Sequence, residues 1–77
     1  MRERIRRVIA DTFRLAPDAV GDDAGMLTVP GWDSLGHLEL MLALEMEFGV
    51  HLAMEDMAAL STLQEIEAHL GGRERAA

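Results

Sequence analysis

Residues 34–48, SLGHLELMLALEMEF, constrain the fold more than any other segment, because they form a helix-length run with apolar residues on two sides. At about 100° per residue, Leu40, Leu44 and Phe48 fall on one side of such a helix. Four further apolar residues fall on nearly the opposite side: Leu35, Leu38, Leu42 and Met46. One side can pack into a core, so the other must contact a second part of the chain or another molecule.

The chain has 77 residues and no cysteine, so its fold must be held by the packing of one small core. Neither a disulfide framework nor a thiolate metal site is possible. A chain of this size has little room for a deep, enclosed active site. The Asp22, Asp23 and Gly25 cluster lacks the alternating oxygen ligands and distant glutamate of an EF-hand loop, so we expect no metal site.

The first third of the chain predicts a helix followed by a long loop. Residues 2–14 carry apolar residues at helical spacing, with most arginines turned to solvent. The apolar positions are Ile5, Val8, Ile9, Thr12 and Phe13. Residues 15–33 hold both prolines and show no sustained periodicity. Such a loop must be packed by its own apolar residues, and we expect Val20, Leu27 and Val29 to fill the gap between helices.

The second helix should begin at Asp33 or Ser34, because both are common N-cap residues, and end at Gly49. A short third helix is expected over residues 53–60. Met41, Met54 and Met57 should lie where these two helices meet, since flexible thioethers fill irregular gaps.

Ser61 and Gln64 have the spacing of a capping box, which predicts a last helix that ends at Gly71 and Gly72. This helix would bury Leu63, Ile66 and Leu70. The expected fold is therefore an all-α four-helix bundle, made of three main helices and a short third one, with a long first loop. Residues 1–72 would form one domain and residues 73–77 a disordered tail.

Charge is distributed unevenly along the chain. All seven basic residues are arginines, and residues 15–72 contain none of them against eleven Asp and Glu residues. Such a surface repels nucleic acid and anionic lipid and favours a basic protein partner. No apolar run is long enough to span a membrane or to act as a secretion signal. We expect a cytoplasmic, acidic monomer that binds neither nucleic acid nor membranes.

Ser34 has three possible roles. A serine at a helix start commonly caps the helix, because its oxygen accepts a backbone N–H. Asp33, Ser34 and His37 are also the residue types of a hydrolytic triad, but three neighbours at one helix start are not arranged for histidine to bridge the other two. Nothing in the sequence supplies an oxyanion hole. The third role is covalent modification.

The stretch WDSLGHLELMLALEMEFGV resembles the start of the second helix in acyl carrier proteins. The resemblance covers most of the chain, from the first helix and long loop to the Asp33-Ser34-Leu35 motif and the capped last helix. It implies that Ser34 receives a covalent 4′-phosphopantetheine and that the transferase reads Asp33. A phosphate is favoured at a helix N-terminus, which suits this assignment.

The second apolar side of the helix then has a use as a docking surface. It comprises Leu35, Leu38, Leu42 and Met46, with Glu39 and Glu45 expected at its rim. An apolar centre with an acidic rim fits enzymes that present apolar patches ringed by arginine or lysine. The expected partners are a phosphopantetheinyl transferase and enzymes that load and process acyl groups. The alternative is that a curled third helix buries this side.

The sequence departs from the commonest acyl carrier pattern at three places. Gly36 and Met46 stand where carriers of fatty-acid synthesis tend to have acidic residues, and Trp32 stands where small residues are frequent. We therefore expect a discrete carrier, not an enzyme, that holds thioester intermediates of a specialised polyketide, modified acyl or aminoacyl pathway. The alternatives are a fatty-acid synthase carrier, an unmodified helical interaction module, or a small hydrolase that uses Ser34 and His37.

Overall fold

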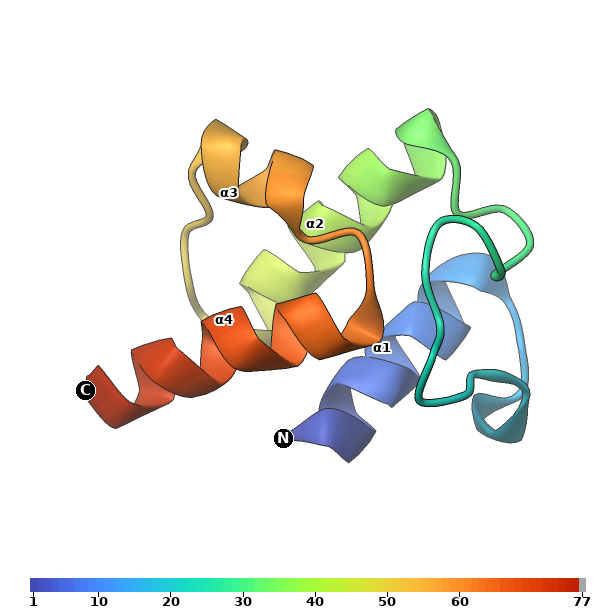
Figure 1. The fold of residues 1–77 in the computed structure, drawn as a ribbon, viewed down its shortest axis with the longest axis horizontal. Helices are drawn as coiled ribbons and strands as arrows, with labels where there is room; N and C mark the ends of the chain where they lie inside the picture. The colour runs from blue at the N-terminus through green and yellow to red at the C-terminus, as the bar shows by residue number, and fades with distance from the viewer. Residues whose placement is uncertain (77) are drawn as a thin grey trace.

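Four α-helices and one short 3-10 helix make up the computed structural model, which describes the backbone of residues 1–76 and the side chains of residues 1–71 (Figure 1). The elements are α1 (Arg2–Phe13), η1 (Pro17–Ala19), α2 (Ser34–Phe48), α3 (Met54–Ala59) and α4 (Leu63–Ala76). No strand occurs in residues 1–76, and one isolated bridge joins Gly25 to Thr62. The predicted all-α bundle is confirmed.

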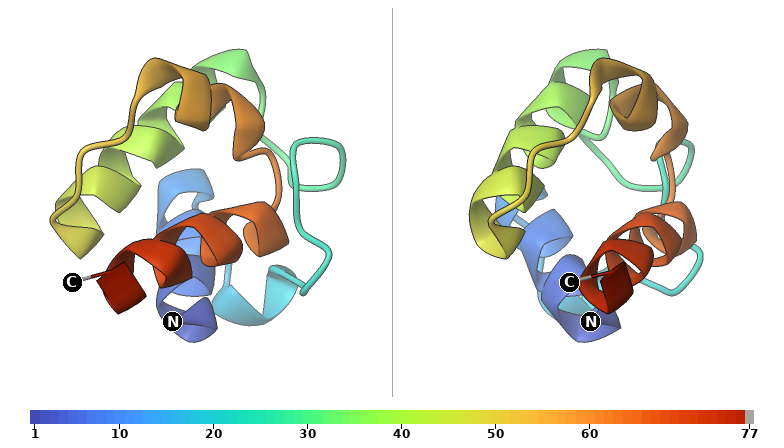
Figure 2. Two further views of the ribbon diagram at one scale, coloured as in Figure 1. Left: turned by 60° about the vertical axis from the view of Figure 1, so that its left-hand side comes forward. Right: turned by 90° about the vertical axis from the view of Figure 1, so that its left-hand side faces the viewer.

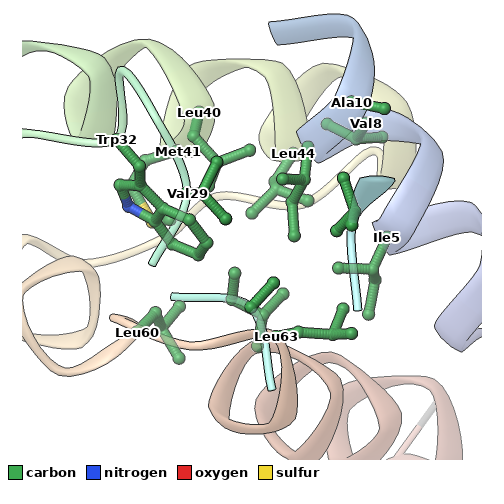
Figure 3. Packing of buried hydrophobic residues seen from close by; sticks show 14 of the residues in the cluster. Ile5, Val8, Ala10, Val29, Trp32, Leu40, Met41, Leu44, Leu60 and Leu63 are labelled. Carbon is green, nitrogen blue, oxygen red and sulfur yellow. The ribbon is translucent and has the colours of Figure 1, made fainter. Parts of the chain in front are cut away.

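The core lies between α1, α2 and α4, and the loop before α2 closes one end of it (Figures 2 and 3). Its largest fully buried side chains are Trp32, Ile5, Ile9, Leu40, Met41, Leu44, Leu52, Leu63, Ile66, Leu70 and Val20. Leu40 and Leu44 confirm the predicted inner side of α2. Phe48 is only half-buried, because its ring lies at the surface beneath the Arg4 guanidinium, 4.4 Å from its centroid.

Three of the four arginines of α1 connect elements, which corrects the expectation of a solvated basic face. Arg2 pairs with Glu67 of α4 at 2.6 Å, and Arg6 pairs with Asp22 of the loop at 2.6 Å. Arg4 pairs with Glu47 at the end of α2. The carboxylates that pair with these arginines come from the loop, α2 and α4, so they cannot be predicted from the pattern of α1 alone.

The long loop is fastened to the start of α4. The Met26 N–H donates to the Ser61 carbonyl at 3.1 Å, and the Leu63 N–H donates to the Ala24 carbonyl at 2.9 Å. Val20 and Val29 are buried, as predicted. Leu27 is 100% exposed, so its predicted role in filling the core is wrong. The turn that follows Gly25 projects this side chain outward.

The cap of α4 lies one residue later than predicted. Thr62 Oγ1 accepts the Glu65 N–H at 3.1 Å, so Thr62 and Glu65 replace Ser61 and Gln64. The helix also continues through both glycines to Ala76, because Gly71 does not adopt the left-handed conformation that ends α2 at Gly49. α4 thus reaches into the predicted tail, of which Ala77 lies outside the described residues. The domain boundary at residue 72 stays a prediction.

Candidate functional site

Ser34 is the first residue of α2 and its side chain is exposed. The helix is capped by its neighbour, because Asp33 Oδ1 accepts the Gly36 N–H at 2.9 Å. The Ser34 hydroxyl has no hydrogen-bond partner within the described part of the chain. The capping role therefore belongs to Asp33, and the serine hydroxyl is left accessible to another reactant.

Close backbone packing shapes the turn that presents Ser34. Gly31 has a φ of 88°, which a glycine adopts at no steric cost. A Cβ on Gly36 would overlap the Gly31 carbonyl oxygen and lie 2.8 Å from Phe13 Cε1. Gly36 therefore lets the first turn of α2 pack against α1. From the sequence, Gly36 is notable only because it stands where an acidic residue is common in fatty-acid carriers. Its packing role cannot be predicted from the sequence, because Gly31 and Phe13 come close only in the folded chain.

His37 is held by two hydrogen bonds that exclude it from a triad. Trp32 Nε1 donates to His37 Nδ1 at 2.9 Å, and His37 Nε2 lies 2.6 Å from the Met57 carbonyl oxygen. Since Nδ1 accepts, Nε2 carries the hydrogen and donates to Met57. Neither nitrogen is directed to Ser34, and Asp33 is occupied as the cap. The arrangement provides no nucleophile with an adjacent base.

The outer side of α2 carries exposed apolar residues. Between 50% and 86% of each side chain is exposed for Leu35, Leu38, Leu42 and Met46, and for Met54 of α3. The alternative that α3 buries this side is therefore wrong. Met41 is buried in the core and Met57 packs against it, whereas Met54 is 86% exposed and fills no gap. Glu39 is also exposed.

Glu45 is not an exposed rim residue. Its side chain is only 17% exposed, and its Oε2 atom accepts the Leu52 N–H at 2.7 Å. The same oxygen lies 3.3 Å from His51 Nδ1. The chain turns back after Gly49 and brings Leu52 over the last turns of α2. A helical wheel of α2 does not include the segment after Gly49, so the expected exposure of Glu45 is wrong.

The first turn of α2 can accommodate a phosphate on Ser34. The N-terminal N–H groups of a helix point outward without intrahelical partners, and the helix dipole favours negative charge there. The Ser34 hydroxyl is exposed at this helix start. No group of three or more potential metal ligands occurs among the described residues. In the same part of the chain, no helix is long and apolar enough to cross a membrane.

Residues 3–70 match the family model described as a phosphopantetheine attachment site. This chain belongs to the acyl carrier protein family. It is 31% identical to the acyl carrier protein of Zymomonas mobilis over 68 residues, which cover 88% of this chain and 87% of that protein. It is 34% identical to the acyl carrier protein of Thermosynechococcus vestitus over 64 residues, covering 83% and 79% respectively.

Family membership agrees with the expectation of a carrier and not of a catalyst. Acyl carrier proteins hold a covalent 4′-phosphopantetheine, and the accessible serine at the helix start fits this group. Its terminal thiol supplies the chemistry, because it carries the acyl group as a thioester. The partners of an acyl carrier protein are a phosphopantetheinyl transferase and acyl-handling enzymes.

Proposed function

We propose that Ser34 carries the 4′-phosphopantetheine and that the protein presents thioester-bound intermediates to successive enzymes. The observation that carries this proposal is the exposed, unpartnered hydroxyl at the start of α2, directly after the capping Asp33. Asp33 and Leu35 complete the motif, and both are exposed to an approaching transferase. The polypeptide contributes position and accessibility, while the thiol of the prosthetic group carries the cargo.

The docking surface that we propose consists of the exposed apolar residues next to this serine, with one acid among them. Its members are Leu35, Leu38, Glu39, Leu42 and Met46. Burying these exposed apolar groups against a partner is favourable. Residues 15–72 contain no arginine or lysine, so we expect the partner to present basic residues around its own apolar patch. Glu45 is not part of this surface, because its side chain is mostly shielded from solvent.

The cargo that we propose belongs to a specialised pathway, with an acyl carrier of fatty-acid synthesis as the alternative. Met46 supports this, since it places an exposed apolar side chain where an acid is common in fatty-acid carriers. Gly36 supports it less than its sequence position suggests, because packing against Gly31 accounts for that glycine. A loading assay with a polyketide extender, a fatty-acid extender and an aminoacyl donor separates these cargoes.

Intact mass after reaction with a phosphopantetheinyl transferase tests the attachment site. The parent protein should gain one phosphopantetheinyl unit, and Ser34→Ala should gain none. Ser61→Ala, at the only other serine, is the matched control and should be modified like the parent. Modification of Ser34→Ala, or an unmodified parent with a competent transferase, would show that the proposed site is wrong.

A further inference from the structure

The helix α3 has little packing of its own to hold it in place. It has six residues, none of them buried, and no side-chain cap at its N-terminus. Met57 packs against the core, but Met54 and Glu55 are exposed. Because short helices without buried apolar residues are marginal, the position of α3 depends on contacts outside the helix, among them the buried Leu52 and Leu60 on either side of it.

Two polar side chains of α2 add hydrogen bonds to this segment, one on either side of the start of α3. Glu45 accepts the N–H of Leu52, two residues before α3, at 2.7 Å. His37 reaches the carbonyl oxygen of Met57, inside α3, at 2.6 Å. We call this pair, His37 and Glu45, the α3 clamp. From α4, His69 Nε2 approaches Asp56 Oδ2 at a longer 3.9 Å.

Trp32 fixes the orientation of the His37 ring. The indole is 2% exposed and stacks on the Phe13 ring, with centroids 5.8 Å apart, while the His37 ring lies nearly parallel to it, with centroids 6.2 Å apart. Its Nε1 hydrogen bond to Nδ1 leaves only Nε2 of the imidazole to donate to Met57. The buried indole of the loop thus directs a hydrogen-bond donor at α3.

We propose that His37 and Glu45 are positioning residues that hold α3 beside α2 and thereby set the arrangement of the docking surface with the exposed Met54 of α3. The proposal rests on the proposed function for its docking step. It assigns Glu45 to backbone recognition within the carrier, and not to a charge contact with the partner. Position 45 then requires an oxygen that accepts a hydrogen bond, and it does not require a negative charge.

Hydrogen exchange of the amides of residues 52–60 tests the structural part without any partner enzyme. Glu45→Ala should speed exchange at Leu52 and in α3, and His37→Phe should speed it from Met57 onward, each by about three- to tenfold, as for one lost hydrogen bond. Glu45→Gln and His37→Gln retain an acceptor oxygen and an N–H donor respectively, and should restore most of the protection. Glu39→Ala, on the exposed side of α2, is the matched control.

Unchanged exchange of residues 52–60 in both Glu45→Ala and His37→Phe would overturn the clamp. The two substitutions are independent, so a failure of His37→Phe to fold leaves Glu45→Ala as the test. The single indole N–H signal of Trp32 gives a second readout. It should shift and exchange faster in His37→Phe, and an unchanged signal would contradict the Trp32–His37 contact.

Transferase kinetics on the unmodified protein test the consequence for docking. Glu45→Ala should raise KM about three- to tenfold with little change in kcat, because α3 is displaced while Ser34 is not. Glu45→Gln should retain the parent KM. Equal damage by Glu45→Gln and Glu45→Ala would overturn the proposal, because it would make the charge a docking contact. An unmodifiable parent would instead refute the proposed function and leave the exchange result standing.

Discussion

Among single residues, Gly36 matters for the position of Ser34, because its packing fixes the first turn of α2. Gly36 has no room for a Cβ beside the Gly31 carbonyl, and the ring of Phe13 closes the other side. Asp33 caps the same turn, so the exposed Ser34 hydroxyl is held on a backbone that is fixed from two directions. A residue without functional atoms thus helps to determine where the functional atom lies.

Gly36→Ala should lower the free energy of unfolding by about 1–3 kcal/mol, because the new methyl group forces α2 away from Gly31 and Phe13. This loss opposes the gain of up to about 1 kcal/mol that alanine brings to a helix. Gly71→Ala is the control, since nothing lies within 4 Å of a Cβ there and the substitution should stabilise. Urea denaturation curves of both variants measure the difference. Equal stabilisation by both would contradict the packing role of Gly36.

At the scale of elements, α2 carries different interactions on its two apolar sides. Leu40, Met41 and Leu44 are fully buried against the rest of the core. Leu38 and Leu42 are half-exposed on the other side and contribute to the proposed docking surface. Leucines only two positions apart on this helix should therefore differ in how much they contribute to the free energy of unfolding.

Leu40→Ala and Leu44→Ala should each cost about 2–5 kcal/mol of unfolding free energy, because each leaves a cavity in the core. Leu38→Ala and Leu42→Ala should stay within about 0.5 kcal/mol of the parent and raise the transferase KM. Circular dichroism melts and transferase assays on the four variants measure both effects. Unfolding by Leu38→Ala would show that the outer side stabilises the fold and does not serve docking.

At the scale of the whole molecule, ion pairs tie α1 to the loop and to α4. Arg6 lowers the pKa of Asp22 below its ordinary 3.8 by hydrogen bonding and charge, and Arg2 lowers the pKa of Glu67 below its ordinary 4.5 in the same way. A carboxylate with a lowered pKa stabilises the fold above its unfolded pKa. That stabilisation is lost as the pH falls through the pKa of the folded state.

Asp22→Asn should therefore lower Tm at pH 6–7, where the parent pair is fully charged. The Tm difference from the parent should shrink as the pH falls below 3.8, where the parent loses the same charge. Asp23→Asn is the control, because Asp23 forms no ion pair among the described residues. Melting curves across this pH range measure the effect. A Tm difference that persists undiminished at the lowest pH would show that the ion pair is not its source.

The existence of the four helices, the Asp33-Ser34 start of α2 and the family resemblance could be predicted from the sequence, because helical spacing and N-cap chemistry depend on residues within a few positions of one another. The two ends of α4 could not, because Thr62 replaces Ser61 as its cap and the helix continues past Gly71. The roles of Glu45, His37 and Leu27 depend on how distant parts of the chain meet, which no local pattern shows. Glu45 meets a backbone N–H seven residues away and His37 a carbonyl twenty residues away. A helical wheel places a side chain on a face, but the path of the chain beyond the helix decides whether that face meets solvent, a backbone group or the core.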